Sequence, residues 1–149
     1  VLFNPEIPPN TGNIMRLCAN TSSSLHIIEP MGFDINDKSL RRAGMDYLKN
    51  IKISIYENIS DFLNKSLFNR YFLVSKYGEY SYAEIRYNQN DCFIFGSESS
   101  GLPEKIIKNF MNSKKIYIPM SQGSRSLNLA NAVSVIIYEA LRQNKFQFL

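Results

Sequence analysis

Three loops of this sequence combine glycine, proline and small polar side chains in a way that suits ligand binding. In chain order they read NPEIPPNTGNIMRL, FIFGSESSGLPEKI and IPMSQGSRSLNLANAV. Each follows a short apolar run typical of a buried strand and leads into an expected helix. Ligands of α/β proteins bind beyond the carboxyl ends of the strands, so these loops are the first candidates for a binding site.

The first loop places an arginine near the start of a helix. Pro5, Pro8 and Pro9 stiffen the exit from the strand because proline fixes φ. Thr11 is the expected N-cap of the helix, and Arg16 lies about one turn into it. Taken alone, this loop is equally compatible with a ligand site and with a well-capped helix that carries a solvated arginine.

The second loop offers backbone rather than reactive side chains. Gly96 and Gly101 flank small hydroxyls and let the backbone approach a ligand closely, while Pro103 suits the first position of a helix. Neither G-x-x-x-x-G-K-[ST] nor G-x-G-x-x-G occurs here, so nucleoside triphosphate and dinucleotide binding are not favoured. Glu98 is a candidate ligand-binding residue, with capping of a neighbouring amide as the alternative.

The third loop, Ser121 to Ser126, leads into a helix that is apolar around most of its circumference. Such a helix must be buried on more than one side, so we expect it to pack on the sheet and on a second copy of the chain. One arc of about 120° is polar. We expect this polar stripe to line a cleft or a subunit seam, with a solvent-facing stripe as the alternative; it consists of Asn128, Asn131, Ser134, Tyr138 and Arg142.

Strand-like and helix-like segments alternate along the whole chain. The expected strands are VLFN, LHIIE, IKISIYE, RYFLVSK, DCFIFG and KIYIP. The expected helices are Thr11–Thr21, Lys38–Tyr47, Ile59–Leu67, Pro103–Phe110 and Leu127–Asn144. This alternation predicts an α/β fold with a mostly parallel sheet flanked by helices. The segment from residue 80 to residue 90 has too few apolar positions to assign.

Composition narrows the classes of protein that fit. With 149 residues and no internal boundary, the chain is expected to form a single domain, residues 1–149. The net charge of +4 permits a nucleic-acid partner. No apolar run reaches the length of a membrane span and no signal peptide opens the sequence, although residues are expected to precede Val1. One histidine and two scattered cysteines favour a cytoplasmic protein with reduced thiols and no metal site.

Together the three loops resemble the signature motifs of the SPOUT superfamily of RNA methyltransferases. The matching segments are NTGNIMR, FGSESSGLP and IPMSQGSRSLNLANAVSVIIYEA, in the family's order and spacing. With LHIIEPMGF and LRRAGMDY, the chain is most similar to the subgroup that methylates the ribose 2′-hydroxyl of the wobble cytidine or uridine of tRNA. The resemblance implies a C-terminal deep trefoil knot, a homodimer formed through the last helix, and no separate RNA-binding domain.

The resemblance also implies a role for particular residues. S-adenosylmethionine would be bound, largely through backbone amides, by Val74, Ser75, Gly96, Glu98, Ile118, Met120, Ser126 and Leu127. Catalysis would involve Asn10, Arg16, Ser126, Asn128 and Tyr138. A guanidinium is a poor base, so Arg16 is better suited to stabilising an alkoxide or holding a phosphate, while Tyr138 would orient the nucleoside or relay a proton. RNA would be contacted by Lys38, Arg41, Arg42 and Arg125, for which a solvated basic face is the alternative.

Two positions depart from the family pattern. The second motif reads SESSG where a basic residue is common, and Ala130 stands where serine is frequent. Three other functions remain open at this point: methylation of a ribosomal RNA ribose, a non-catalytic RNA-binding factor of the same fold, and a nucleotide-binding or small-molecule-binding α/β protein.

Overall fold

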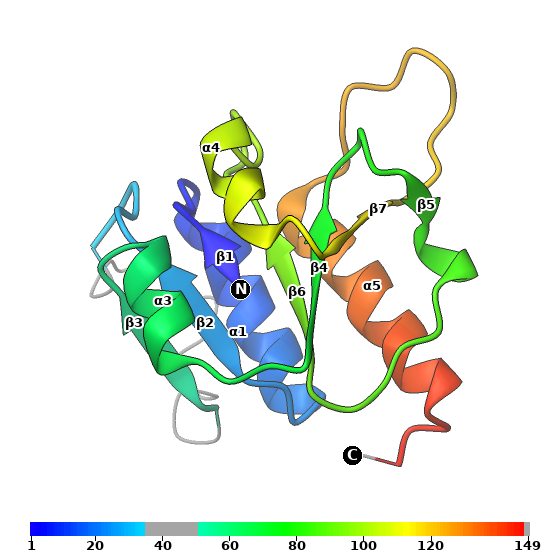
Figure 1. Ribbon diagram of the computed structural model, residues 1–149, viewed down its shortest axis with the longest axis horizontal. Helices are drawn as coiled ribbons and strands as arrows, with labels where there is room; N and C mark the ends of the chain where they lie inside the picture. Colours follow the sequence, from blue (N-terminus) through cyan, green and yellow to red (C-terminus); the bar gives the residue numbers. More distant parts are fainter. Residues whose placement is uncertain (35–50, 148–149) are drawn as a thin grey trace.

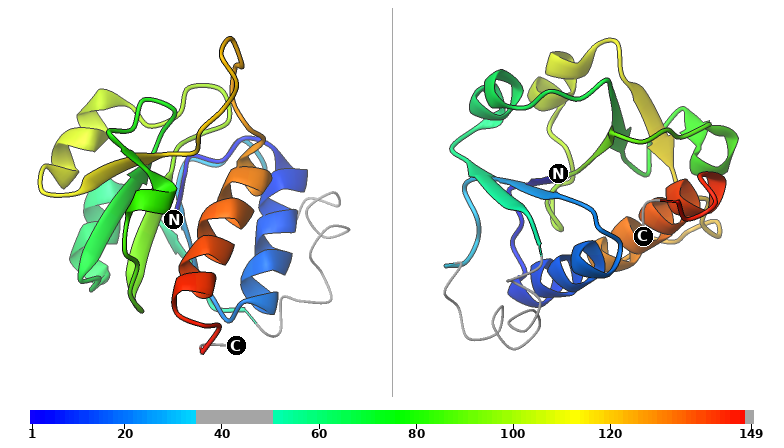
Figure 2. Two further views of the ribbon diagram at one scale, coloured as in Figure 1. Left: turned by 90° about the vertical axis from the view of Figure 1, so that its right-hand side faces the viewer. Right: turned by 90° about the horizontal axis from the view of Figure 1, so that it is seen from below.

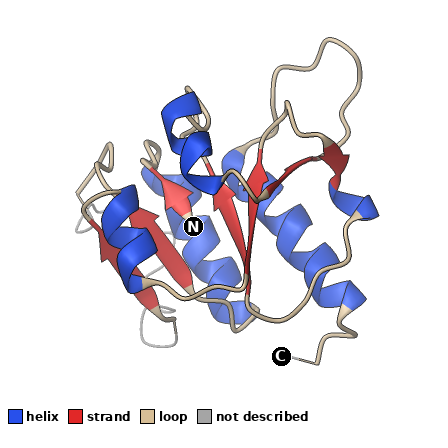
Figure 3. Ribbon diagram, viewed as in Figure 1, coloured by secondary structure: helices blue, strands red, loops and turns tan. Residues whose placement is uncertain are grey.

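The computed structural model describes residues 1–34 and 51–147 of the chain. Among these residues, seven strands form one sheet in the order β3-β2-β1-β6-β4-β7-β5, and every pair of neighbours is parallel (Figures 1 and 3). The strands are β1 (Leu2–Phe3), β2 (Leu25–Ile28), β3 (Ile53–Tyr56), β4 (Arg70–Val74), β5 (Tyr80–Ser81), β6 (Asp91–Phe95) and β7 (Lys114–Tyr117). The predicted α/β class with a parallel sheet is confirmed.

Helices cover both faces of the sheet. Figure 2 shows α1 (Pro8–Asn20) and α5 (Leu129–Gln143) side by side on one face, with α3 (Ile59–Lys65) and α4 (Glu104–Ile107) on the other. Two short 3₁₀ helices, η2 (Tyr82–Glu84) and η3 (Lys108–Phe110), complete the described elements. The predicted helix Lys38–Tyr47 lies outside the described residues.

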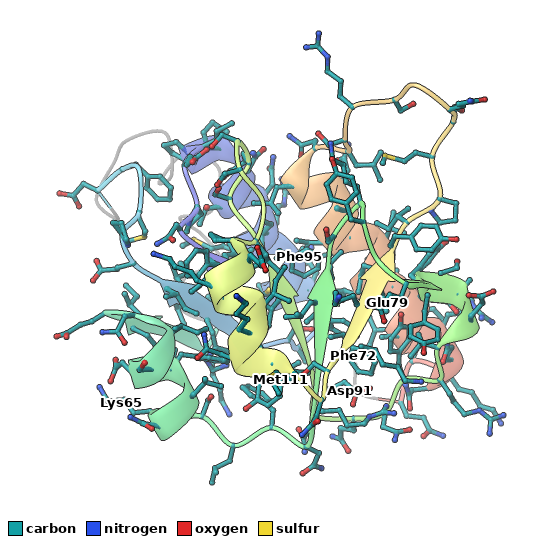
Figure 4. The ribbon with its side chains drawn as sticks, turned by 45° about the horizontal axis from the view of Figure 1, so that its top comes forward. Lys65, Phe72, Glu79, Asp91, Phe95 and Met111 are labelled. Carbon is teal, nitrogen blue, oxygen red and sulfur yellow. The ribbon has the colours of Figure 1, made fainter. Side chains whose placement is uncertain are left out.

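The central strand β6 has apolar side chains on both of its faces. Phe93 and Phe95 belong to the core under α1 and α5, whereas Cys92 and Ile94 belong to the core under α3 and α4. Side chains alternate between the two faces of a strand, so a strand that is covered on both faces needs apolar residues at every position. Figure 4 shows the Phe95 side chain in the interior of the molecule.

The register of the strands brings their carboxyl ends to one level. Phe95 of β6 is paired with Leu2 of β1 and with Val74 of β4, and Val74 is in turn paired with Ile116 of β7. Loops that follow β1, β4, β6 and β7 therefore all leave the sheet at the same edge, the upper edge in Figure 1. This arrangement brings the three loops singled out from the sequence together.

Several predicted boundaries differ from those observed. Helix α1 begins at Pro8 and not at Thr11, because Pro8 and Pro9 occupy its first positions, where their missing N–H groups and fixed φ cost nothing. The expected N-cap role of Thr11 is therefore wrong. Helix α5 begins at Leu129 rather than Leu127, since Asn128 is its N-cap. Strand β5 was not anticipated: two residues are too few to show a period.

Helix α5 is fixed against the sheet along its whole length. Its inner side, which includes Val133 and Ile136, is buried, and each such side chain contributes about 1.5–3 kcal/mol. Near its end, the Gln143 side chain accepts from the backbone N–H of Tyr87 (2.9 Å) and donates to the carbonyl of Ile85 (2.9 Å). The end of α5 is thereby fixed to the segment between η2 and β6.

Candidate functional site

A cavity of about 660 Å³ opens at the carboxyl edge of the sheet, where the three loops meet. Its size is typical of small-molecule sites. All eight residues that were predicted to bind a cofactor line it: Val74, Ser75, Gly96, Glu98, Ile118, Met120, Ser126 and Leu127. Asn10 and Asn128, two of the predicted catalytic residues, line it as well. The structure thus brings these ten predicted residues together around one cavity.

The second loop forms a tight backbone wall of the cavity. Ser97 and Gly101 exchange two backbone hydrogen bonds of 3.2 and 2.9 Å, and the Ser97 and Ser100 hydroxyls lie 2.8 Å apart. A Cβ on Gly96 would lie 2.0 Å from the carbonyl carbon of Gly101, and Gly101 itself has a φ of +67°. Gly96 is therefore needed for the close packing of the loop on its own backbone, and Gly101 for its left-handed turn.

Glu98 joins the second loop to the first. Its carboxylate accepts hydrogen bonds from the backbone N–H groups of Glu6 (2.8 Å) and Ile7 (3.2 Å) and from Nδ2 of Asn10 (3.0 Å). Capping of neighbouring amides, the alternative considered for this residue, is therefore what its carboxylate does in the structure. Glu98 also lines the cavity, so it supports the site from within its wall.

Asn10 and Asn128 join the first loop to the third. Oδ1 of Asn10 accepts from Nδ2 of Asn128 at 2.8 Å. Oδ1 of Asn128 in turn accepts from the backbone N–H groups of Ala130 (2.9 Å) and Asn131 (3.3 Å) and caps α5. Because the donor and acceptor of each amide are both engaged, the side-chain orientations of Asn10 and Asn128 are fixed at the cavity.

Glu6 was not among the predicted site residues. Its carboxylate accepts from the backbone N–H (3.0 Å) and the hydroxyl (2.7 Å) of Ser99, so the first and second loops hold each other reciprocally. The only acidic residue in an otherwise apolar or polar stretch, NPEIPPN, was the signal that could have revealed it.

Lys76 and Tyr77 also line the cavity and were not foreseen. Strand β4 ends at Val74, so Lys76, the last residue of the expected strand RYFLVSK, lies with Tyr77 in the turn that follows. Tyr77 is 78% exposed, and Nζ of Lys76 lies 4.9 Å from the centre of its ring. An aromatic ring and an ammonium group thus lie next to each other at the rim of the cavity.

The remaining predicted residues are distributed more widely. Arg16 is exposed on α1 and Tyr138 is 48% exposed on α5, and neither lines the cavity of this chain. Arg125 is exposed on the loop before α5, which projects above the sheet in Figure 1. Lys38, Arg41 and Arg42 lie outside the described residues. The polar stripe of α5 does face outward, with Asn131, Tyr138 and Arg142 exposed.

The chemical character of the site is polar, with apolar walls and no cluster of metal ligands. Within residues 1–34 and 51–147, no three His, Cys, Asp or Glu side chains lie close enough to hold a metal ion. In the same part of the chain, no helix combines the length and the apolar character needed to cross a membrane. Backbone amides and fixed side-chain amides suit a polar ligand whose orientation matters.

Comparison with known proteins assigns the chain to a family. The sequence profile of the SpoU rRNA Methylase family matches residues 1–138. The chain belongs to this family. The family resemblance inferred from the three motifs is thereby confirmed.

Relatives and solved structures match nearly the whole chain. The tRNA (cytidine(34)-2'-O)-methyltransferase of Escherichia coli (strain K12) is 49% identical over 143 residues, which cover 96% of this chain and 91% of the relative. A structure solved to study the 2-OH methylation of C/U34 on tRNA has a TM-score of 0.90 and 39% identity, covering 98% of this chain and 95% of that one. An AdoMet-bound rRNA methyltransferase from Sinorhizobium meliloti has a TM-score of 0.82 and 25% identity, covering 95% and 54%.

Proposed function

We propose that this SpoU-family protein transfers a methyl group from S-adenosylmethionine to the ribose 2′-hydroxyl of the wobble pyrimidine, position 34, of a tRNA. The observation that carries the proposal is the cavity formed by three loops, locked together through Glu98, Asn10 and Asn128. A relative named for methylation of cytidine 34 shares 49% of its residues across nearly the full chain, which supports the same substrate here.

The residues of the cavity fit S-adenosylmethionine. Val74, Ile118 and Leu127 offer apolar contact for an adenine ring, and the glycine-bounded second loop leaves backbone groups accessible at the wall. When bound, the cofactor supplies an activated methyl group on a sulfonium centre. The chain then has to hold the two reactants in line, which is a large part of the barrier to such a transfer.

Different side chains would position the loops, stabilise the reacting groups and contact the RNA. The hydrogen bond between Asn10 and Asn128 fixes the first loop relative to the third. Ser126 lines the cavity two residues before Asn128, so its position in the cavity is fixed as well. Arg16 would stabilise the developing alkoxide or hold the adjacent phosphate, and Tyr138 would orient the nucleoside or relay its proton. Arg125, with Lys38, Arg41 and Arg42, would contact the RNA backbone.

The outer side of α5, where the exposed Tyr138 ring lies near half-buried Val135, supports a homodimer formed through this helix, and a functional site completed by the second copy. Arg16 and Tyr138 lie outside the cavity of their own chain, which is expected if they serve the site of the partner. A trefoil knot in the C-terminal third is part of the same proposal. It is supported by the path of the chain, which crosses from β6 past β4 to β7 and then returns to α5 on the opposite face from α4 (Figure 2).

The decisive experiment uses labelled S-adenosylmethionine and total tRNA from a cytoplasmic extract of a strain that lacks this enzyme. We expect label in a 2′-O-methylated pyrimidine at the wobble position, identified by nucleoside analysis. If label appears only in ribosomal RNA, the substrate is a ribose of ribosomal RNA and not the wobble nucleotide of tRNA. Cofactor binding with no transfer to either RNA would favour a non-catalytic RNA-binding factor.

A further inference from the structure

The turn that follows β4 is held rigidly against β7. The backbone N–H of Ser75 donates to the carbonyl of Ile116 (3.0 Å), and the Gly78 N–H closes the turn on the Ser75 carbonyl (3.0 Å). The Tyr77 N–H donates to the Ser75 hydroxyl at 3.2 Å. A Cβ on Gly78 would lie 2.4 Å from the carbonyl carbon of Ile116, so the turn approaches β7 as closely as glycine allows.

The far side of the turn is anchored to the same strand. The Glu79 N–H donates to the Lys115 carbonyl (2.8 Å), and the Glu79 carboxylate lies 2.7 Å from Nζ of Lys115. Figure 4 shows the Glu79 side chain beside β7. Tyr77 is therefore carried by a segment that is fixed on both sides, so its backbone cannot readily move to bury the ring.

An exposed aromatic ring that is held rigidly at the rim of a binding cavity can stack on a base of a nucleic acid. Tyr77 remains 78% exposed although it lines the cavity, and the Lys76 ammonium stands 4.9 Å from its ring centre. Aromatic rings stack on unpaired bases of any sequence, and neighbouring lysines neutralise backbone phosphates. The chain as a whole carries a net charge of +4, which favours the same polyanionic partner.

We infer that Tyr77 and Lys76 form a stacking platform for an unpaired base of the RNA, next to the nucleotide whose ribose enters the cavity. The inference rests on the proposed function and names a part of the RNA-binding surface that the sequence motifs did not indicate. Tyr77 stacks on the base and Lys76 holds a phosphate of the same strand. Their fixed position at the rim sets the register of the strand relative to the cavity.

The chain provides a matched control for this platform. Tyr80 is also exposed (42%), and Nζ of Lys114 lies 5.0 Å from its ring centre, but neither residue lines the cavity. Tyr77→Ala and Tyr80→Ala therefore remove the same ring from the same kind of lysine–tyrosine pair, and only the first is at the rim. Tyr77→Phe retains the stacking surface and removes only the hydroxyl.

The test measures the KM for tRNA in methyl transfer and the Kd for S-adenosylmethionine by calorimetry. We expect Tyr77→Ala to raise the KM for tRNA about tenfold, the range of a lost stacking contact, with the cofactor Kd unchanged. Tyr77→Phe and Tyr80→Ala should remain within about twofold of the unmodified protein. Lys76→Gln should reduce the dependence of tRNA binding on salt concentration.

Two results would overturn the platform. An unchanged KM for tRNA in Tyr77→Ala would exclude it, and so would equal losses in Tyr77→Ala and Tyr80→Ala. A raised cofactor Kd with an unchanged tRNA KM would assign Tyr77 to the cofactor site instead. Failure of the proposed function is distinguishable, because the unmodified protein would then transfer no methyl group to tRNA at all.

Discussion

At the scale of single residues, Glu98 accepts hydrogen bonds from three donors on another loop. A glutamine at this position offers one acceptor oxygen, and its NH₂ group would face a donor. We expect Glu98→Gln to lower the free energy of unfolding by about 1 kcal/mol, because at least one donor loses its partner. We also expect weaker cofactor binding, since Asn10 is no longer held. Urea denaturation and calorimetry measure the two effects.

Glu6→Gln is the appropriate comparison for this change. The Glu6 carboxylate also joins the first two loops, but it is exposed and, among residues 1–34 and 51–147, accepts from Ser99 alone. Water can replace these hydrogen bonds, so the loss of stability should be smaller than for Glu98→Gln. Equal losses would mean that Glu98 is not the principal link between the loops.

A substitution of Arg16 distinguishes a role in cofactor binding from a role in methyl transfer. Because its side chain does not line the cavity of its own chain, Arg16→Ala should leave the Kd for S-adenosylmethionine within about twofold. Methyl transfer should be abolished if Arg16 stabilises the alkoxide or the phosphate. Single-turnover transfer and calorimetry separate the two, with the exposed Arg86→Ala as a control for loss of charge. A large loss of cofactor affinity would show that Arg16 supports the cavity instead.

At the scale of elements, Asn128 both begins α5 and fixes the site. Its Oδ1 caps two backbone N–H groups of the helix, and its Nδ2 donates to Asn10. Asn128→Asp retains the cap but places a carboxylate against the Oδ1 of Asn10, whereas Asn128→Ala removes both interactions. We expect the alanine variant to lose about 1 kcal/mol of stability and the aspartate variant less, with impaired methyl transfer in both.

Thermal unfolding and methyl transfer, measured on both Asn128 variants, decide this point. A stable aspartate variant with low activity would separate the cap from the hydrogen bond to Asn10. Should the aspartate variant unfold as easily as the alanine variant, the cap would not be the main contribution of Asn128 to α5.

The elements also show what the sequence could and could not predict. Long segments with clear apolar patterns, such as α5 and β6, were correctly predicted, because burial on one or two faces imposes the pattern. The cavity wall was predicted through motif resemblance, which encodes contacts between distant loops. The reciprocal role of Glu6, the strand β5 and the rim position of Tyr77 depend on how loops meet in space, and no local period encodes that.

At the scale of the whole molecule, the single histidine of the sequence makes stability depend on pH. His26 packs against the rings of Phe62 and Phe68, and its Nδ1 lies 2.9 Å from the Tyr56 hydroxyl. Burial lowers the pKa of His26 from 6.5 to about 4. Between these values the unfolded chain binds a proton that the folded chain does not, so stability falls as pH decreases from 6.5 toward 4.

We expect the free energy of unfolding to be about 1 kcal/mol lower at pH 5 than at pH 7.5, after allowing for solvent screening of this partly exposed ring. Urea denaturation at the two pH values measures the difference. His26→Gln has no group that titrates in this interval and should largely remove the dependence. If the variant keeps the same dependence on pH, the carboxylates and not His26 are responsible.

The outer side of α5 leads to the prediction for the assembled molecule. Val135 is half-buried and Tyr138 is 48% exposed on the side of the helix that faces away from the sheet. If a second copy covers this side, the protein should sediment at micromolar concentration with twice the mass of one chain. Val135→Glu should then shift it to the monomer, because a carboxylate buried without a partner costs several kcal/mol. Lys65→Glu on α3, the opposite face, should leave the dimer intact.

Methyl transfer measured on the same samples connects assembly with function. If Arg16 and Tyr138 serve the cavity of the partner, Val135→Glu should lose activity in proportion to its loss of dimer, although both side chains are still present. Cofactor affinity should change little, because Glu98, Asn10 and Asn128 hold the cavity together within one chain. A monomeric unmodified protein would exclude the dimer, and a fully active monomeric variant would show that each chain completes its own site.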